Sequence, residues 1–124
     1  MTRVIQMTPY QSANMAVLPV IISGELGSQT VTAKLDTGAE LCCVDYRLIT
    51  AVTALPPLRS TNVTGMTGTS TAPVPVYALN LELAGHVFQN VEVVAGLQPR
   101  HVIGMNLLNR LQVYFNGPAD HFLL

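Results

Sequence analysis

Hydrophobic residues recur at every second position through most of this chain. Between residues 16 and 36 the alternation is broken only by SGELGS, residues 23–28, whose glycines suit a tight turn. Successive side chains of a strand point to opposite faces of the sheet. The pattern therefore predicts two strands joined by a turn, with Leu35 and Asp36 on opposite faces of the second strand.

The rest of the chain continues this pattern. Residues 59–83 predict a second hairpin, whose tip falls in the glycine-flanked stretch Gly65–Gly68, and residues 87–96 predict the next strand after an Ala-Gly-His turn. Only residues 104–111, GMNLLNRL, have the apolar spacing of a helix. Residues 111–124 predict a strand, an Asn-Gly-Pro turn and a last strand. We expect an all-β fold with one short helix near the C-terminus.

The composition fits one domain that associates with itself. A chain of 124 residues is about the size of one domain, so we expect a single domain over residues 1–124. Residues 1–15 are expected to be a flexible leader and residues 116–124 a C-terminal strand extension.

Hydrophobic residues make up 49% of the chain and charged residues only 10%, and excess apolar surface favours an interface. The net charge is −1 without a basic run, which argues against a nucleic-acid partner, and no apolar stretch reaches the roughly 18 residues of a membrane span.

Cys42 and Cys43 are the only cysteines, and they are adjacent. Neighbouring cysteines rarely bridge each other, and no third or fourth ligand lies nearby to complete a zinc site. We interpret them as two small apolar residues in a strand. The absence of a disulfide framework predicts a reducing, intracellular location, the cytoplasm, with a membrane tether outside this sequence left as an open alternative.

The stretch KLDTGAE, residues 34–40, places an aspartate at the end of an apolar strand. A carboxylate in such a position is costly unless it is hydrogen-bonded or functional. Gly38 suits a tight turn, and the Thr37 hydroxyl can form a hydrogen bond across an interface. Together these residues predict that Asp36 is held rigidly, with its carboxylate exposed in a cleft.

The motif Asp36-Thr37-Gly38-Ala39 resembles the catalytic motif of the aspartic proteases. Two further motifs are similar to those of the single-domain retroviral type, the retropepsins. TGMTG, residues 64–68, resembles their flap, and HVIGMNLLNRL, residues 101–111, resembles the glycine motif before their one helix. The motifs occur in the family's order and spacing, and the similarity extends over about residues 17–115. It implies a closed, partly barrel-like fold with a β-hairpin flap.

The resemblance implies an aspartic endopeptidase that works as a homodimer on an extended peptide or protein substrate. This chemistry needs two carboxylates that share one proton, and no second acidic residue of the chain is followed by Thr-Gly or Ser-Gly. Asp36 of each subunit would meet its counterpart on the two-fold axis, without a metal or organic cofactor. The implied catalytic residues are Asp36, Thr37 and Gly38. The implied substrate-binding residues are Lys34, Ala39, Glu40, the flap residues Gly65, Met66, Thr67 and Gly68, and Arg100 and Val102.

Several positions depart from the family pattern. Glu40 and Met105 replace an aspartate and an arginine that form an ion pair in many retropepsins, so Glu40 is expected either to pair elsewhere, for example with Arg110, or to face the cleft. Lys34 and Arg100 stand where the family usually has apolar residues beside the scissile bond. Two cations there predict tolerance for polar or acidic side chains around the cut, unless Lys34 extends into solvent.

The C-terminal segment continues beyond the end of the shortest retropepsins. Residues 116–124, NGPADHFLL, predict a hairpin that pairs either within its own chain or across the dimer.

Two functions other than an aspartic endopeptidase remain open. One is a peptide-binding relative without useful turnover, and the other is a purely structural dimerisation module. A functional dyad is favoured because a binding domain gains nothing from bringing two like carboxylates together.

Overall fold

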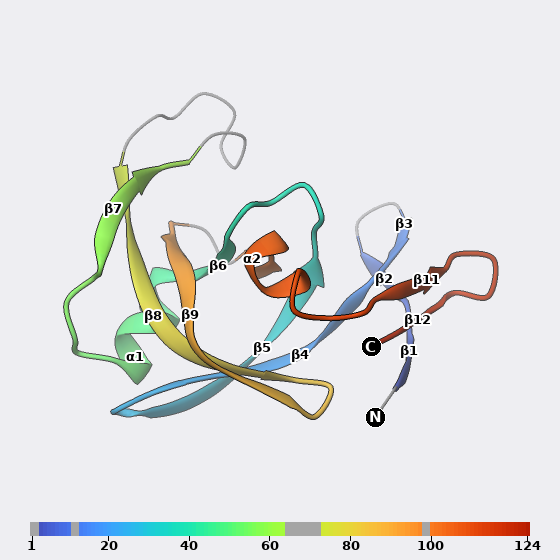
Figure 1. Cartoon of the computed structure of the whole chain (residues 1–124), viewed down its shortest axis with the longest axis horizontal. Coiled ribbons are helices and arrows are strands. Elements are labelled where there is room, and N and C mark those ends of the chain that lie inside the picture. The colour runs from blue at the N-terminus through green and yellow to red at the C-terminus, as the bar shows by residue number, and fades with distance from the viewer. Residues whose placement is uncertain (1–2, 11–12, 64–72, 98–99) are drawn as a thin grey trace.

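The computed structural model describes residues 3–10, 13–63, 73–97 and 100–124. Strands dominate it, which confirms the all-β class (Figure 1). The elements in chain order are β1 (Val4–Gln6), β2 (Thr8–Tyr10), β3 (Ala13–Met15), β4 (Val17–Gly24), β5 (Gly27–Leu35), β6 (Cys42–Asp45), α1 (Tyr46–Val52), β7 (Arg59–Asn62), β8 (Pro73–Leu83), β9 (His86–Gly96), β10 (Val102–Ile103), α2 (Met105–Leu108), β11 (Tyr114–Asn116) and β12 (His121–Leu123).

The main sheet closes on itself. Its strand order is β4-β5-β10-β6-β9-β8-β7, and an additional pairing of β4 with β8 joins the ends of the ring, leaving β7 as an edge strand beyond β8. β10 is parallel to β5, and β6 is parallel to β9, whereas the other neighbours are antiparallel. A sheet closed in this way has few exposed edges. The closed, partly barrel-like architecture is therefore confirmed.

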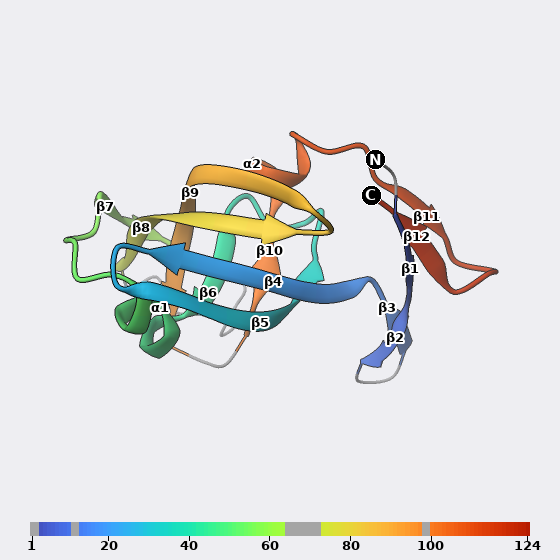
Figure 2. The ribbon, with the colours of Figure 1, turned by 90° about the horizontal axis from the view of Figure 1, so that it is seen from below.

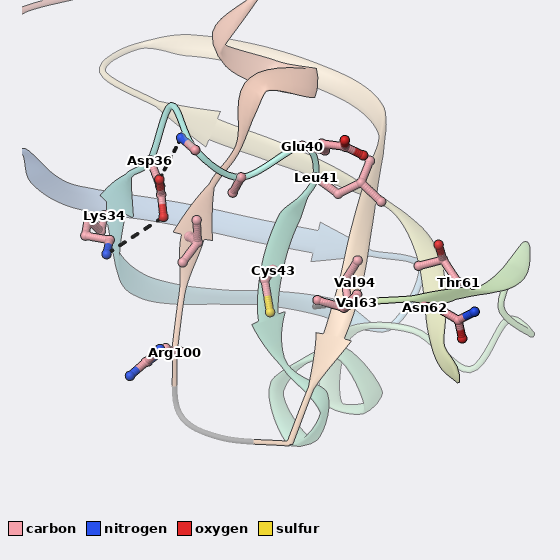
Figure 3. A pocket seen from close by; sticks show the side chains of 13 residues that line it. Lys34, Asp36, Glu40, Leu41, Cys43, Thr61, Asn62, Val63, Val94 and Arg100 are labelled. Atoms are coloured by element: carbon pink, nitrogen blue, oxygen red, sulfur yellow. Dashed lines mark hydrogen bonds and ion pairs between the residues drawn. The ribbon is translucent and has the colours of Figure 1, made fainter. Parts of the chain in front are cut away.

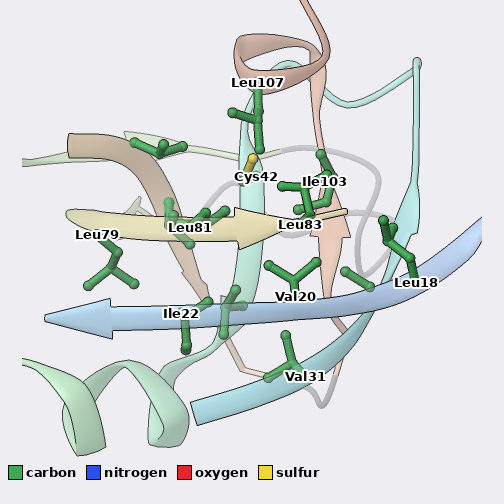
Figure 4. Packing of buried hydrophobic residues seen from close by; sticks show 14 of the residues in the cluster. Leu18, Val20, Ile22, Val31, Cys42, Leu79, Leu81, Leu83, Ile103 and Leu107 are labelled. Atoms are coloured by element: carbon green, nitrogen blue, oxygen red, sulfur yellow. The ribbon is translucent and has the colours of Figure 1, made fainter. Parts of the chain in front are cut away.

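The interior of this ring is filled by the apolar residues of the alternating pattern. β-branched and leucine side chains on the inner face of each strand pack against those of the strands opposite (Figure 4). On β5 the inner face ends with Leu35, whereas Lys34 and Asp36 lie on the other face and are only partly buried. Labelled core residues in Figure 4 are Leu18, Val20, Ile22, Val31, Cys42, Leu79, Leu81, Leu83, Ile103 and Leu107.

The described residues contain two helices, and the expectation of a single one was wrong. α2 occupies the start of the predicted helical segment 104–111, whereas α1 follows β6 without any helical prediction. The side chain of Asp45 caps α1 by accepting a hydrogen bond from the backbone of Arg47 at 2.9 Å. Neither helix in these parts of the chain is long or apolar enough to cross a membrane.

The two ends of the chain form a separate small sheet beside the ring (Figure 2). Its order is β1-β12-β11, with both pairings antiparallel. The C-terminal segment thus forms a hairpin within its own chain, which is one of the two arrangements expected for it. Residues 4–6 of the expected leader form β1 of this sheet. β2 and β3 form a short hairpin that leads from β1 into β4.

The hairpin expected at residues 59–83 is present in its described part. β7 pairs antiparallel with β8, from Arg59 opposite Val76 to Asn62 opposite Pro73. The expected flap tip, Gly65–Gly68, lies outside the described residues.

Candidate active site

Asp36 directly follows β5, where the strand passes beside β10. The backbone N–H of Asp36 donates to the carbonyl of Ile103 at 3.0 Å, and that of Lys34 donates to the carbonyl of His101 at 3.0 Å. These bonds continue the parallel pairing of β5 with β10. They hold the aspartate backbone firmly while its side chain points away from the core.

A tight turn orients the Asp36 carboxylate. The backbone N–H of Gly38 donates to Asp36 Oδ1 at 2.8 Å, and that of Ala39 donates to the Asp36 carbonyl at 3.2 Å. The other carboxylate oxygen, Oδ2, lies 3.8 Å from Nζ of Lys34 (Figure 3). The Asp36 side chain remains 35% exposed, so the oriented carboxylate is open to a ligand.

The segment after this turn rests on the start of α2. The backbone N–H groups of Met105 and Asn106 donate to the carbonyls of Ala39 and Glu40, at 2.7 and 3.0 Å. A Cβ on Gly104 would come within 2.6 Å of the backbone of Leu41, so only glycine allows this approach.

The Asn106 side chain completes this support. Its Oδ1 accepts from the backbone N–H of Cys42 at 3.0 Å, and its Nδ2 donates to the carbonyl of Glu92 at 2.9 Å. It thereby connects α2 with β6 and β9. The sequence motif VIGMNLL thus supports the Asp36 turn from behind.

A cavity of about 690 Å³ opens beside Asp36 (Figure 3). Its lining comes from the Asp36 turn, β5, β6, β7, β9 and the segment leading into β10. The lining residues are Lys34, Asp36, Gly38, Ala39, Glu40, Leu41, Cys43, Thr61, Asn62, Val63, Val94, Arg100 and Val102.

Most of the predicted site residues that the structure describes meet in this cavity. Thr37 does not line it, but is exposed at the turn next to Asp36. The predicted flap residues of the stretch 65–68 lie outside the described residues. The residues that sequence reasoning did not include are Leu41, Cys43, Thr61, Asn62, Val63 and Val94.

The charges in the cavity are unevenly distributed. Lys34 lies beside Asp36, and Arg100 lies on the same side of the view but lower, with its guanidinium pointing away from Asp36, whereas Glu40 lies across the view from both cations (Figure 3). Glu40 is exposed and takes part in none of the ion pairs formed within the described residues, so of its two expected arrangements it adopts the one facing the cleft.

The imidazole of His101 and the thiols of Cys42 and Cys43, which lie near the cavity, add no charge to it at neutral pH. Burial lowers the pKa of His101, which precedes β10. Burial also raises the pKa of the Cys42 and Cys43 thiols to about 11, so both stay protonated. Both thiols are free and lie in β6, in agreement with their interpretation as small apolar strand residues.

A family model described as aspartyl protease matches residues 18–107 of this chain. The chain belongs to the aspartyl protease family. The resemblance to the retropepsin-like members is thereby confirmed. No curated protein matches the sequence.

Two acidic residues of the described part of the chain line the cavity, Asp36 and Glu40, and of these Asp36 has its carboxylate held by the backbone of Gly38. Asp45 caps α1, and Glu25 accepts hydrogen bonds from Thr53 and Ala54 after that helix. These two acids therefore have structural roles at the two ends of α1.

Proposed function

We propose that this protein is an aspartic endopeptidase in which Asp36 of two identical subunits forms the catalytic dyad. The observation that supports this most strongly is the Asp36 carboxylate. It is oriented by Gly38, partly exposed, and placed beside a cavity of about 690 Å³ in a member of the aspartyl protease family. A two-fold axis close to Asp36 would supply the second carboxylate from an identical site.

The dyad would act by general acid and base catalysis. Two adjacent carboxylates share one proton, because both cannot easily be ionised at close range. The ionised carboxylate accepts a proton from water as the water oxygen attacks the peptide carbonyl carbon, while the protonated one donates its proton to the carbonyl oxygen. The tetrahedral intermediate then collapses: the carboxylate that took the water proton donates it to the leaving nitrogen, the C–N bond breaks, and the other carboxylate takes back a proton from a hydroxyl of the intermediate. Water is the nucleophile, so no covalent enzyme intermediate forms.

Thr37 and the expected flap would assist this reaction. Thr37 is exposed beside Asp36, and its hydroxyl forms no hydrogen bond within the described residues, which leaves it available to a second subunit. The stretch Gly65–Gly68 would cover an extended peptide in the cavity and exclude water, as the flap resemblance implies.

The first test compares the wild type with Asp36→Asn on a mixed peptide library between pH 4 and 7. Loss of the dyad's acid–base function should lower cleavage by at least about 100-fold. Asp120→Asn is the matched control. It removes a carboxylate that does not line the cavity, and asparagine tolerates the positive φ of 55° at this position. Cleavage that survives Asp36→Asn would contradict the proposal.

The dimer is tested by mixing the two forms. Excess Asp36→Asn protein should suppress the wild type, because mixed dimers contain only one aspartate in the dyad. Wild-type activity should also rise more steeply than linearly with protein concentration, while sedimentation equilibrium follows association. Full activity in a monomer would reject the shared dyad. Peptide binding without any cleavage would instead support the binding-only alternative.

A further inference from the structure

Two cationic side chains line the same cavity as Asp36, one on β5 and one just before the neighbouring strand β10. Lys34 lies opposite Val102 in the parallel pairing of these strands, and Arg100 stands two residues before Val102. Both cations line the cavity, and Lys34 lies beside Asp36 (Figure 3). Strand pairing thus places Lys34 and Arg100 on the same cavity, although they are 66 positions apart in the sequence.

Arg100 has no carboxylate partner within the described residues. Lys34 lies 3.8 Å from Asp36, whereas none of the ion pairs formed within the described residues includes Arg100. Glu40, the other acidic residue of the lining, takes part in none of them either. The guanidinium of Arg100 is therefore open to a ligand.

The proposed dimer would create a positive excess. Two Asp36 carboxylates that share one proton have a single negative charge between them. Two Lys34 and two Arg100 side chains would then face that charge and two Glu40 carboxylates, which leaves one positive charge in excess. An ionised side chain of the substrate would complete the balance.

We propose that the cavity selects an acidic residue, glutamate or aspartate, next to the scissile bond. This inference deepens the proposed protease function and rests on it. A guanidinium binds a carboxylate through two parallel hydrogen bonds, which suits Arg100 to the carboxylate of such a residue. Val102 and Cys43 lie opposite each other in the pairing of β10 with β6 and line the cavity, so they offer an apolar surface to the methylene groups of the acid. Because the two sites of a symmetric dimer are equivalent, the preference applies on either side of the cut.

The test uses peptides that differ only in having Glu, Gln or Leu directly before or after the cleaved bond, with the cut position verified by mass spectrometry. Glutamine has the shape of glutamate without its charge. We expect kcat/KM to be about tenfold higher for Glu than for Gln, since Arg100 is exposed and solvent screening limits the effect. In Arg100→Gln this ratio should fall below about twofold.

Arg110→Gln is the matched control. It also removes one exposed arginine charge, but Arg110 does not line the cavity, so the Glu-to-Gln ratio should stay near its wild-type value. Arg100→Glu is a more stringent test, because it should reverse the preference, so that a peptide with Lys at the same position is cleaved faster than the Glu peptide. A ratio near one in the wild type, or one that Arg100→Gln leaves unchanged, would overturn the inference.

These outcomes are separable from the failure of the protease proposal. Cleavage that depends on Asp36 but does not distinguish Glu from Gln overturns only the acidic preference. If no peptide is cleaved, the protease proposal fails, and fluorescence anisotropy with the labelled Glu and Gln peptides then decides the inference on its own. Tighter binding of the Glu peptide that is lost in Arg100→Gln supports the acidic site, and equal or absent binding overturns it.

Discussion

Asp36 has its orientation because glycines stand at two positions around it where a side chain would intrude. A Cβ on Gly38 would lie 3.2 Å from Asp36 Oδ1, against the carboxylate itself. A Cβ on Gly104 would lie 2.6 Å from the carbonyl carbon and oxygen of Leu41. Gly104 has a φ of −95°, which any residue adopts, so space rather than backbone conformation requires glycine there.

Gly104→Ala should therefore destabilise the protein by overpacking alone. We expect a loss of about 1–3 kcal/mol in the free energy of unfolding, measured by urea denaturation. Activity should fall as well, because the turn of residues 36–41 has to move away from α2. Gly117→Ala is the control, since nothing lies within 4 Å of a Cβ there, and it should change stability by less than about 0.5 kcal/mol. Equal effects of the two substitutions would argue against the steric account.

At the scale of elements, α1 depends on the residue that precedes it. The Asp45 carboxylate accepts from the Arg47 backbone N–H at 2.9 Å and forms an ion pair with the Arg47 guanidinium, with Oδ2 2.9 Å from Nη2. The Arg47 side chain, then its backbone N–H, lower the pKa of Asp45. The helix start is thus stabilised by an ionised aspartate.

The stability that Asp45 contributes should disappear in acid. Because its folded pKa lies below the unfolded value of about 3.9, the contribution is present above pH 4 and is lost as the pH falls through the folded pKa. Asp45→Asn keeps a good capping residue but removes the charge. It should lower Tm near pH 6, and the Tm difference from the wild type should vanish toward pH 2.

Arg47→Gln removes the same ion pair from the other side and should show the same pH dependence of Tm. A Tm difference for Asp45→Asn that persists unchanged to pH 2 would show that the charge is not the stabilising feature. The result also matters for activity measurements, because a protein assayed below pH 4 would have lost part of the stability that ionised Asp45 contributes.

At the scale of the whole molecule, the terminal sheet joins both ends of the chain to the ring. Phe122 on β12 is fully buried and belongs to the same core cluster as the ring strands, whereas Tyr114 on β11 is 60% exposed. The backbones of Arg3 and Leu124 also exchange two hydrogen bonds, at 2.8 and 3.1 Å. All three strands of this sheet thus come from one chain.

Phe122→Ala should detach this sheet from the core. We expect a loss of about 3–5 kcal/mol in the free energy of unfolding, because a large buried aromatic side chain is replaced by a cavity. Tyr114→Ala on the neighbouring strand should cost less than about 0.5 kcal/mol. Denaturation is to be followed by circular dichroism at one fixed protein concentration, since dimerisation would change apparent stability. Similar small losses for both variants would show that the terminal sheet contributes little to the fold.

Strand pattern and turn chemistry could be predicted because they are local. Alternation along β5 placed Leu35 inside and Asp36 on the other face, and the glycine at position 38 indicated the turn that orients the carboxylate. The motif at residues 101–111 was singled out only by its resemblance to the family, and the structure shows that it supports that turn from behind. α1 was missed because Ile49 and Val52 are β-branched and weaken the helical signal, although Asp45 is a good capping residue.

The sequence by itself determined which residues line each face of the strands, where the chain turns, and that one aspartate is presented without a second one. These properties follow from side-chain alternation and backbone freedom within a few residues. Only the tertiary structure decided which distant strands meet. Ring closure through β4 and β8 is one such result, and the placement of Lys34 and Arg100 on one cavity is another. Pairing of this kind depends on burying the whole core at once, so no single segment specifies it.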